Sequence, residues 1–318
     1  MTSSLVIGLS AVVVAIKDGE AVALVVRPKG AGGLSGLPFG PFDPDGHRTF
    51  ELALRAFVTE QTRFDLGYVE QLYTFGDKGR DAPLADLGGG GTARVISVGY
   101  LALAPAAVDT RFAGSEWRPW SRIFPWEDWR SGRPPVLDPI ETALRAWAAN
   151  EPQRLARMRL AFALDGAPWN EERVLERYEL LYEAGLAPEA ARDRGEAAPV
   201  HAPELAAALG EAMTSDHRRI LATALGRLRG KLKYRPVVFE LMPEAFTLSA
   251  LQKTVEAIAG VPLHKQNFRR GLERADLVEG LGRFDVETGG RPAELFRFRR
   301  EILGARPVGG LSLPLLRE

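Results

Sequence analysis

Two helical patterns separated by a glycine-containing turn, near the end of the chain, constrain the fold more than any other feature of the sequence. The first begins after Thr247, a residue type that often caps a helix, and ends at Gly260. The second runs over LHKQNFRRGLERADLVEG from Leu263. A helix, a short turn and a second helix in this order are typical of a helix-turn-helix, whose second helix reads the DNA major groove.

The apolar residues of this region predict how the two helices pack. One face of the first helix is apolar, and Phe268 and Leu272 are expected to turn the second helix toward the same core; the apolar face of the first helix consists of Leu248, Leu251, Val255 and Ile258. Two predicted strands, 281–286 and 293–299, follow and are joined by ETGGR. A hairpin in this place predicts the wing of a winged helix.

The polar side of the second helix carries side chains that can hydrogen-bond to base edges. Arg and Lys donate to guanine, while Asn and Gln can pair with adenine through two hydrogen bonds. The candidate DNA-binding residues are His264, Lys265, Gln266, Asn267, Arg269 and Arg270. Arg291, in the turn of the wing, is expected to reach a phosphate or the minor groove. The alternative is a small helical protein-interaction module with a charged face.

Charge supports a division of the chain into two parts. The formal net charge is zero, with 41 basic and 41 acidic residues. Residues 216–303 nevertheless hold 17 Lys and Arg against 11 Asp and Glu, a balance of +6 that leaves −6 for the rest. This asymmetry is expected when one domain binds phosphates and another does not. A solvated basic surface without a partner is the alternative.

The first hundred residues alternate strands and a helix. Asp18-Gly19 predicts a tight turn between two strands. A loop rich in Gly and Pro follows, and a helix-spaced apolar pattern follows that loop. The predicted strands are 6–16, 21–28, 68–75 and 94–103, and the predicted helix is 48–62.

The middle of the chain is predicted to be mainly helical. Helices are expected over 139–160 with a break near Pro152, over 171–184, and over 203–228 with an interruption at Gly210 and an end by Gly230. Residues 185–202 indicate a surface connection, and KLKYRPVVFELMP predicts a short strand. Four tryptophans are expected to pack in a core, with stacking on a base or a partner as the alternative: Trp117, Trp120, Trp126 and Trp129.

Length and composition set the remaining bounds. A chain of 318 residues favours two domains. Zero cysteines exclude a disulfide framework and a thiolate metal site. The apolar run from Leu5 to Ile16 is too short to cross a bilayer and has no basic segment before it, so we expect no signal peptide and a cytoplasmic location.

Several segments resemble one known family. YVEQLYTFGDKGRD at 68–81 and RVISVGYLAL at 94–103 are similar to the Nudix-related regulators of NAD metabolism, the NrtR-type repressors. DHRRILATALGRLRGKLKYRPVVFELMPEAFTLSALQ and HKQNFRRGLERADLVE resemble the linker helix and winged helix of that group. PWEDWRSGRP and the extra helices resemble its alphaproteobacterial NadQ branch.

The resemblance implies an α+β fold in three parts. A Nudix-like α/β/α sandwich with a helical extension is expected over 1–185, a connection and linker helix over 186–230, and a winged helix-turn-helix over 231–318. The implied function is a homodimeric repressor of NAD biosynthesis or salvage genes that binds double-stranded operator DNA. The implied effector is ADP-ribose, with ATP or another NAD-related metabolite still open, and no cofactor is required.

The catalytic motif of Nudix hydrolases is degenerate here. These enzymes use three carboxylates on one helix to gather magnesium around a pyrophosphate. Aligning LPFG at 37–40 and Arg55 with the family motif places Ala56, Thr59 and Glu60 at the three acidic positions. With two carboxylates missing, we expect neither a metal site nor hydrolysis.

A pocket for a nucleotide can outlast the chemistry. The resemblance assigns it Arg27, Arg55, Glu60, Phe75, Asp77 and Arg80, whose three arginines can pair with phosphates. Each arginine has an alternative role in a surface ion pair. Two other functions stay open: an active Nudix pyrophosphatase whose C-terminal domain docks a partner, and an architectural DNA-binding protein without an effector.

Overall fold

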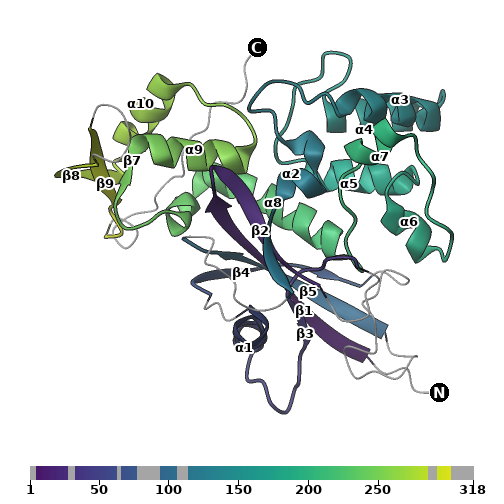
Figure 1. The fold of residues 1–318 in the computed structure, drawn as a ribbon, viewed down its shortest axis with the longest axis horizontal. Coiled ribbons are helices and arrows are strands. Elements are labelled where there is room, and N and C mark those ends of the chain that lie inside the picture. Colours follow the sequence, from purple (N-terminus) through teal and green to yellow (C-terminus); the bar gives the residue numbers. More distant parts are fainter. Residues whose placement is uncertain are drawn as a thin grey trace.

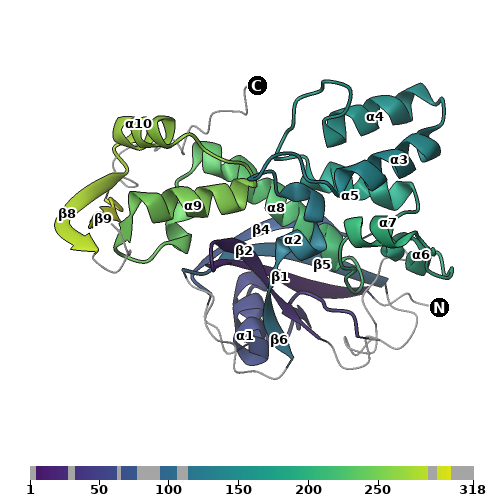
Figure 2. The same ribbon diagram turned by 45° about the horizontal axis from the view of Figure 1, so that its top comes forward.

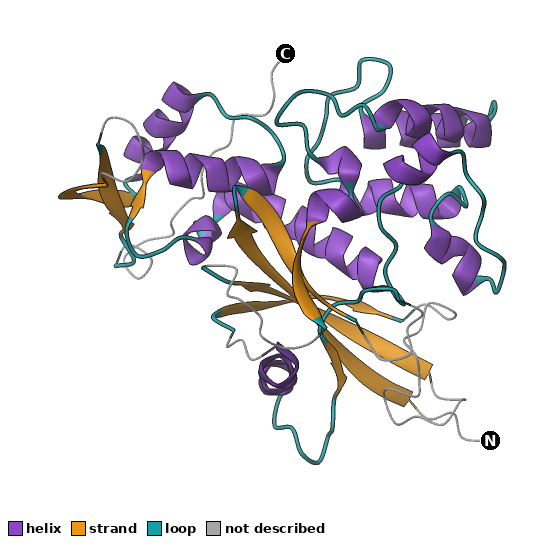
Figure 3. Ribbon diagram, in the orientation of Figure 1, coloured by secondary structure: helices purple, strands orange, loops and turns teal. Residues whose placement is uncertain are grey.

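The structure is a computed structural model, and it describes residues 5–27, 33–62, 66–76, 94–105, 114–285 and 292–301. A mixed β-sheet near one end of the chain is flanked by helices on both faces, and a second, small sheet lies with two helices at the far end of the molecule (Figures 1 and 3). None of the described helices is long and apolar enough to cross a membrane.

The larger sheet has the strand order β4-β5-β1-β2-β6, with β3 paired to β1. Strand β1 is antiparallel to β2 and parallel to β5. Positive φ angles of 51° at Asp18 and 77° at Gly19 form the predicted turn of the first hairpin. The strands are β1 Leu5–Lys17, β2 Glu20–Val26, β3 Phe39–Pro41, β4 Tyr68–Phe75, β5 Arg94–Leu103 and β6 Ser115–Pro119.

Helices α1 (Phe50–Thr62) and α8 (His217–Tyr234) cover opposite faces of this sheet (Figure 2). Leu9 and Val13 of β1 belong to the hydrophobic core under α1, while Val12 belongs to the core under α8. Because both faces of β1 are buried, the strand reads as a nearly continuous apolar run. The predicted α/β/α sandwich is confirmed.

The middle of the chain forms the expected helical extension. The break between its two longest predicted helices is confirmed, because α3 ends before Ala149 and α4 starts at Pro152. The elements are α2 Trp120–Ile123, η2 Pro125–Glu127, α3 Leu137–Ala148, α4 Pro152–Phe162, α5 Val174–Glu183, α6 Pro188–Asp193 and α7 Pro203–Ala208.

The interpretation of residues 185–202 as a surface connection was wrong in part, because α6 lies within this segment with buried residues. The carboxylate of Glu189 is buried and accepts a hydrogen bond from the Met213 backbone N–H at 3.0 Å. Its other oxygen lies 3.5 Å from Arg218 of α8. Contacts with residues more than twenty positions away therefore anchor α6, and a local sequence pattern does not predict such contacts.

The tryptophans pack in the core, as predicted. Trp120 and Trp126 are buried. The ring of Trp129 lies 4.4 Å from that of Trp169, centroid to centroid, while Trp117 is half-buried on β6. Trp120, Trp126 and Trp129 belong to the core that joins the sheet to the extension, while Trp117 packs on the core under α1.

Helix α8 differs from the sequence prediction at its C-terminal end. The interruption at Gly210 is confirmed, but the helix passes Gly230 and ends at Tyr234. The described residues of KLKYRPVVFELMP form the end of α8 and the 3-10 helix η3 (Val237–Leu241) instead of a strand. A Cβ atom at Gly226 or Gly230 would lie 2.7 Å or 3.1 Å from oxygen atoms of Glu172. Both glycines therefore serve close packing, and Gly230 does not end the helix.

The C-terminal unit is a winged helix. The hydroxyl of Thr247 accepts a hydrogen bond from the Ala250 N–H at 3.1 Å, and Gly260 ends the helix with φ 69°, so both predicted caps are confirmed. The prediction omitted β7 and started β8 three residues late. The elements are β7 Phe246–Thr247, α9 Leu248–Ala259, α10 Lys265–Ala275, β8 Val278–Asp285 and β9 Ala293–Phe298, with sheet order β7-β9-β8.

Candidate nucleotide and DNA sites

Helix α1 presents the three positions of the degenerate motif to solvent. Ala56, Thr59 and Glu60 are all exposed, and their spacing places them on one face of the helix. Of these three residues, Glu60 is the one that has a carboxylate. In the described part of the chain, no three His, Asp or Glu side chains lie together in a way that would hold a metal ion.

Arg55 uses its donors within the chain. Its Nε donates to Glu51 at 3.0 Å, and its terminal nitrogens donate to the carbonyl of Leu66 and, at 3.0 Å, to that of Gly67. The side chain therefore ties α1 to the segment that leads into β4. A phosphate at Arg55 would have to share or replace these bonds.

Gln61 fixes the loop in front of α1, and sequence reasoning missed it. Its amide oxygen accepts from the Phe39 N–H at 3.2 Å, and its amide nitrogen donates to the Phe39 carbonyl at 2.7 Å. The side chain thus replaces a strand partner for β3. A glutamine next to the aligned acidic position is the only local signal for this contact.

Of the other predicted ligand residues, Arg27 and Phe75 lie in the described part of the chain. Arg27 is largely exposed just after β2, and its guanidinium lies 3.5 Å from the carboxylate of Glu116. Phe75 is buried under α8, where the guanidinium of Arg219 lies 5.7 Å from its ring centroid. The sheet therefore separates Phe75 from α1. Asp77 and Arg80 lie outside the described residues.

Helix α10 has a buried apolar side and an exposed polar side, as predicted. Phe268 and Leu272 are buried against α9. The exposed side carries all six candidate DNA-binding residues: His264, Lys265, Gln266, Asn267, Arg269 and Arg270. Helix α10 itself lies beyond α9, at the end of the molecule away from the larger sheet (Figure 2). Arg291 lies outside the described residues.

The positive charge of this face is not neutralised within the described residues. There, Lys265, Arg269 and Arg270 form no ion pair, whereas two arginines of β9 and its end are paired, Arg297 with Glu279 and Arg299 with Asp276. Lys265, Arg269 and Arg270 are therefore available to an anionic partner.

The turn between α9 and α10 is held by two side chains that the sequence analysis did not single out. Gln252 donates to the Leu263 carbonyl at 2.9 Å, and Glu256 accepts from the Leu263 N–H at 2.9 Å. Gln252 and Glu256 also bond to each other at 2.9 Å. This network fixes the angle at which α10 leaves α9, and the four-residue spacing of Gln and Glu was its only signal.

Comparison with known proteins identifies this domain. Residues 238–298 match the family described as the NrtR DNA-binding winged helix domain. The C-terminal domain is thus similar to the NrtR winged helix. The ADPR-responsive transcriptional repressor NtrR of Acinetobacter baylyi is 40% identical over 83 residues, which are 26% of this chain and 33% of the relative. The chain thus spans about a third of the length of this curated relative.

Solved structures extend the similarity to the whole fold. Shewanella oneidensis NrtR complexed with a 27mer DNA matches with a TM-score of 0.55 and 20% identity, over 92% of this chain and 93% of that one. A MutT/nudix family protein from Enterococcus faecalis matches with a TM-score of 0.53 and 14% identity, over 94% and 90%. The fold is therefore that of NrtR, a Nudix-like domain followed by a winged helix, and the resemblance to NrtR-type regulators is confirmed. The NadQ branch stays a prediction.

Proposed function

We propose that the protein is a transcriptional repressor that binds operator DNA through α10 and responds to ADP-ribose in its Nudix-like domain. The observation that carries the proposal is the exposed, unpaired basic face of α10 in a domain of the NrtR winged helix family. The ADPR-responsive repressor among the relatives and the DNA complex of Shewanella oneidensis NrtR support the same role here.

The exposed face of α10 has the chemistry for both parts of DNA recognition. Asn267 and Gln266 offer paired donor and acceptor atoms for adenine, and Arg269 offers a fork of donors for guanine. Lys265 and Arg270 supply charge for phosphates, which gives affinity and sets the register without reading sequence. By resemblance, the target genes are those of NAD biosynthesis or salvage.

The Nudix-like domain is proposed to bind its nucleotide without hydrolysing it. Ala56 and Thr59 stand where a hydrolase needs carboxylates, and Glu60 alone is too little charge to hold magnesium against water. Arg27 and Arg55 lie near enough to exposed surface to meet a diphosphate. ADP-ribose is the first choice of effector, followed by ATP or another NAD-related metabolite, and no cofactor is needed.

We propose a symmetric homodimer that sets two winged helices over the halves of a palindromic operator. The division of labour follows the expected boundaries, with sensing in 1–185, connection in 186–230 and DNA binding in 231–318. If the ligand favours one arrangement by about 1–3 kcal/mol, operator affinity changes roughly 5- to 150-fold. A repressor of this kind acts in the cytoplasm, where bacterial DNA lies.

A gel-shift titration tests the proposal. Purified protein is mixed with the DNA upstream of its own gene, with an NAD-biosynthesis promoter and with unrelated DNA of equal length, and ADP-ribose, NAD, ATP and nicotinate are added separately. We expect one specific complex that one nucleotide alters. Magnesium-dependent release of AMP from ADP-ribose without a specific complex would establish a pyrophosphatase, and binding that no nucleotide affects would establish an architectural protein.

A further inference from the structure

The first turn of α8 is bonded to the loop that leads into α1. Nδ1 of His217 accepts a hydrogen bond from the Leu37 N–H at 2.9 Å. Just before the helix, the Thr214 N–H donates to the Ser35 carbonyl at 3.0 Å. Leu37 starts the LPFG segment, which Gln61 ties to α1. A movement of the loop at the proposed effector site is therefore expected to move the start of α8.

The next residues of α8 pack on the face of the sheet opposite to α1. Arg219 stands over the ring of Phe75. Ile220 and Phe75 fill the space beside Gly99 from two sides, at 3.1 and 3.2 Å from where a Cβ would stand. The first turns of α8 thus contact both the loop before α1 and the sheet, so a nucleotide that moves this loop acts on a helix that is packed along the sheet.

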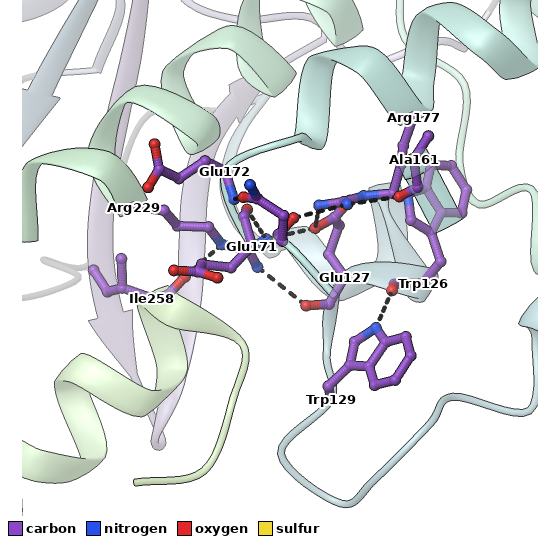
Figure 4. Close-up of polar contacts among 10 residues, drawn as sticks. Trp126, Glu127, Trp129, Ala161, Glu171, Glu172, Arg177, Arg229 and Ile258 are labelled. Atoms are coloured by element: carbon purple, nitrogen blue, oxygen red, sulfur yellow. Dashed lines mark hydrogen bonds and ion pairs between the residues drawn. The ribbon is translucent and has the colours of Figure 1, made fainter. Parts of the chain in front are cut away.

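The far half of α8 holds the winged helix. Nε of Arg229 donates to the carbonyl of Ile258 at 2.9 Å, in the last turn of α9 (Figure 4). Its terminal nitrogens donate to the Glu171 carbonyl at 2.9 Å, to the Glu127 carbonyl at 3.0 Å and to the Glu127 carboxylate. Arg229 is fully buried, so one side chain of α8 caps α9 and locks it to η2.

The surroundings leave this end of α9 little freedom. A Cβ atom at Gly260 would collide with the Glu127 carbonyl and with Arg229. The backbone N–H of Trp129 donates to the Gly260 carbonyl at 2.6 Å. A displacement or rotation of α8 must therefore carry the end of α9 with it or break several buried hydrogen bonds, each of which is costly to leave unmade.

We infer that α8 transmits the state of the effector site to the winged helix, with His217 in its first turn and Arg229 in its C-terminal half as the positioning residues. The helix is 18 residues long and spans about 27 Å, which bridges the two sites in one rigid element. The inference rests on the proposed function. Helix α9 also contacts β2 directly, and that contact is the competing path.

Arg177 supplies a matched control. It pairs with the same Glu127 carboxylate, at 2.9 Å from Nη2, and is equally buried. Its other bonds go to the carbonyls of Ala161 and Asn170 in the extension, at 3.0 Å each, and not to α9. Arg177→Lys and Arg229→Lys therefore disturb the same ion cluster, but only the second loosens α9 from α8.

The test measures a coupling factor, the ratio of the operator dissociation constants with and without ADP-ribose. We expect Arg229→Lys to bring this factor to within about twofold of 1, because lysine cannot reproduce the fork of donors. Arg177→Lys should keep the wild-type factor. At the other end, His217→Phe should lose coupling, and His217→Asn should retain it, because the amide oxygen can replace Nδ1 as the acceptor.

A wild-type coupling factor in Arg229→Lys as well as in Arg177→Lys would overturn the inference in favour of the β2 path. The proposed function would stay intact in that case, provided that the wild-type protein binds the operator and responds to ADP-ribose. If ADP-ribose does not change the operator affinity of the wild-type protein, both the inference and the proposed function are overturned. Hydrogen exchange of the wild-type protein needs no variant: ADP-ribose should change exchange in residues 217–220 and also in 258–260. A change of operator affinity without one at 258–260 contradicts transmission through α8.

Discussion

The Nδ1 atom of His217 accepts a hydrogen bond from the backbone N–H of Leu37 at 2.9 Å, and the ring is buried. Burial, and to a smaller extent the charge of Arg192, lowers the pKa of His217 to about 4. The ring is therefore neutral at physiological pH, which is the state that can accept this bond. Protonation would place a donor against a donor.

This arrangement makes stability depend on pH. Between pH 6.5 and 4 the unfolded chain binds a proton at His217 that the folded protein does not bind, so the free energy of unfolding falls as the pH falls. The titration of His217 should lower the free energy of unfolding by roughly 2 kcal/mol between pH 6.5 and pH 5. Urea unfolding at both values tests this, with His217→Asn as comparator. An equal loss in the two proteins would exclude His217 as the cause.

Removal of the buried Glu127 carboxylate is expected to destabilise the fold strongly. Burial alone would raise its pKa, but the charges of Arg177 and Arg229 lower it below the usual value. Glu127→Ala leaves two guanidiniums buried without a counter-charge and should cost about 3–5 kcal/mol of stability. Glu196→Ala, which removes an exposed pair with Arg194, should cost less than about 1 kcal/mol. Similar denaturation midpoints for the two variants would contradict the role of the buried cluster.

Two glycines of the winged helix should respond in opposite directions to alanine. Gly260 has φ 69° and no room for a Cβ atom, so Gly260→Ala should destabilise by more than about 1 kcal/mol. Gly271 lies inside α10 with no atom within 4 Å of the added Cβ. Gly271→Ala should stabilise by roughly 0.5–1 kcal/mol. Thermal unfolding without DNA measures both, and a loss of stability in Gly271→Ala would contradict the open position.

The sequence predicted the elements whose signals are local. The apolar run of β1, the helical spacing of α1 and the caps of α9 at Thr247 and Gly260 all lie within a few residues of what they specify. The exposed face of α10 was predicted for the same reason, because Phe268 and Leu272 fix which side turns inward.

The features that sequence reasoning missed depend on distant partners. Gly230 was read as a helix end because its packing partner, Glu172, is far away in the chain. The residues Glu127, Arg177 and Arg229 lie at least fifty positions apart, so no local pattern joins them. Phe75 was placed with Arg55 because a sequence does not state which face of a sheet a side chain takes after an irregularity, and β4 has one between Gln71 and Thr74.

The recognition face of α10 is tested by single substitutions. Asn267→Ala or Arg269→Ala should weaken specific operator binding by about 1–3 kcal/mol and leave the fold intact, because both side chains are exposed and proposed to contact base edges. Arg145→Ala, which removes an exposed arginine of α3, should leave operator affinity unchanged. Circular dichroism checks the fold, and wild-type affinity in both α10 variants would remove the assignment of this helix.

The most direct measurement is fluorescence anisotropy of a labelled operator duplex titrated with the wild-type protein, with and without saturating ADP-ribose. A salt-sensitive, sequence-specific complex whose dissociation constant changes by about fivefold or more with ADP-ribose is the predicted result. Unrelated DNA bound with equal affinity, or an operator affinity that ADP-ribose leaves unchanged, would contradict an ADP-ribose-responsive repressor.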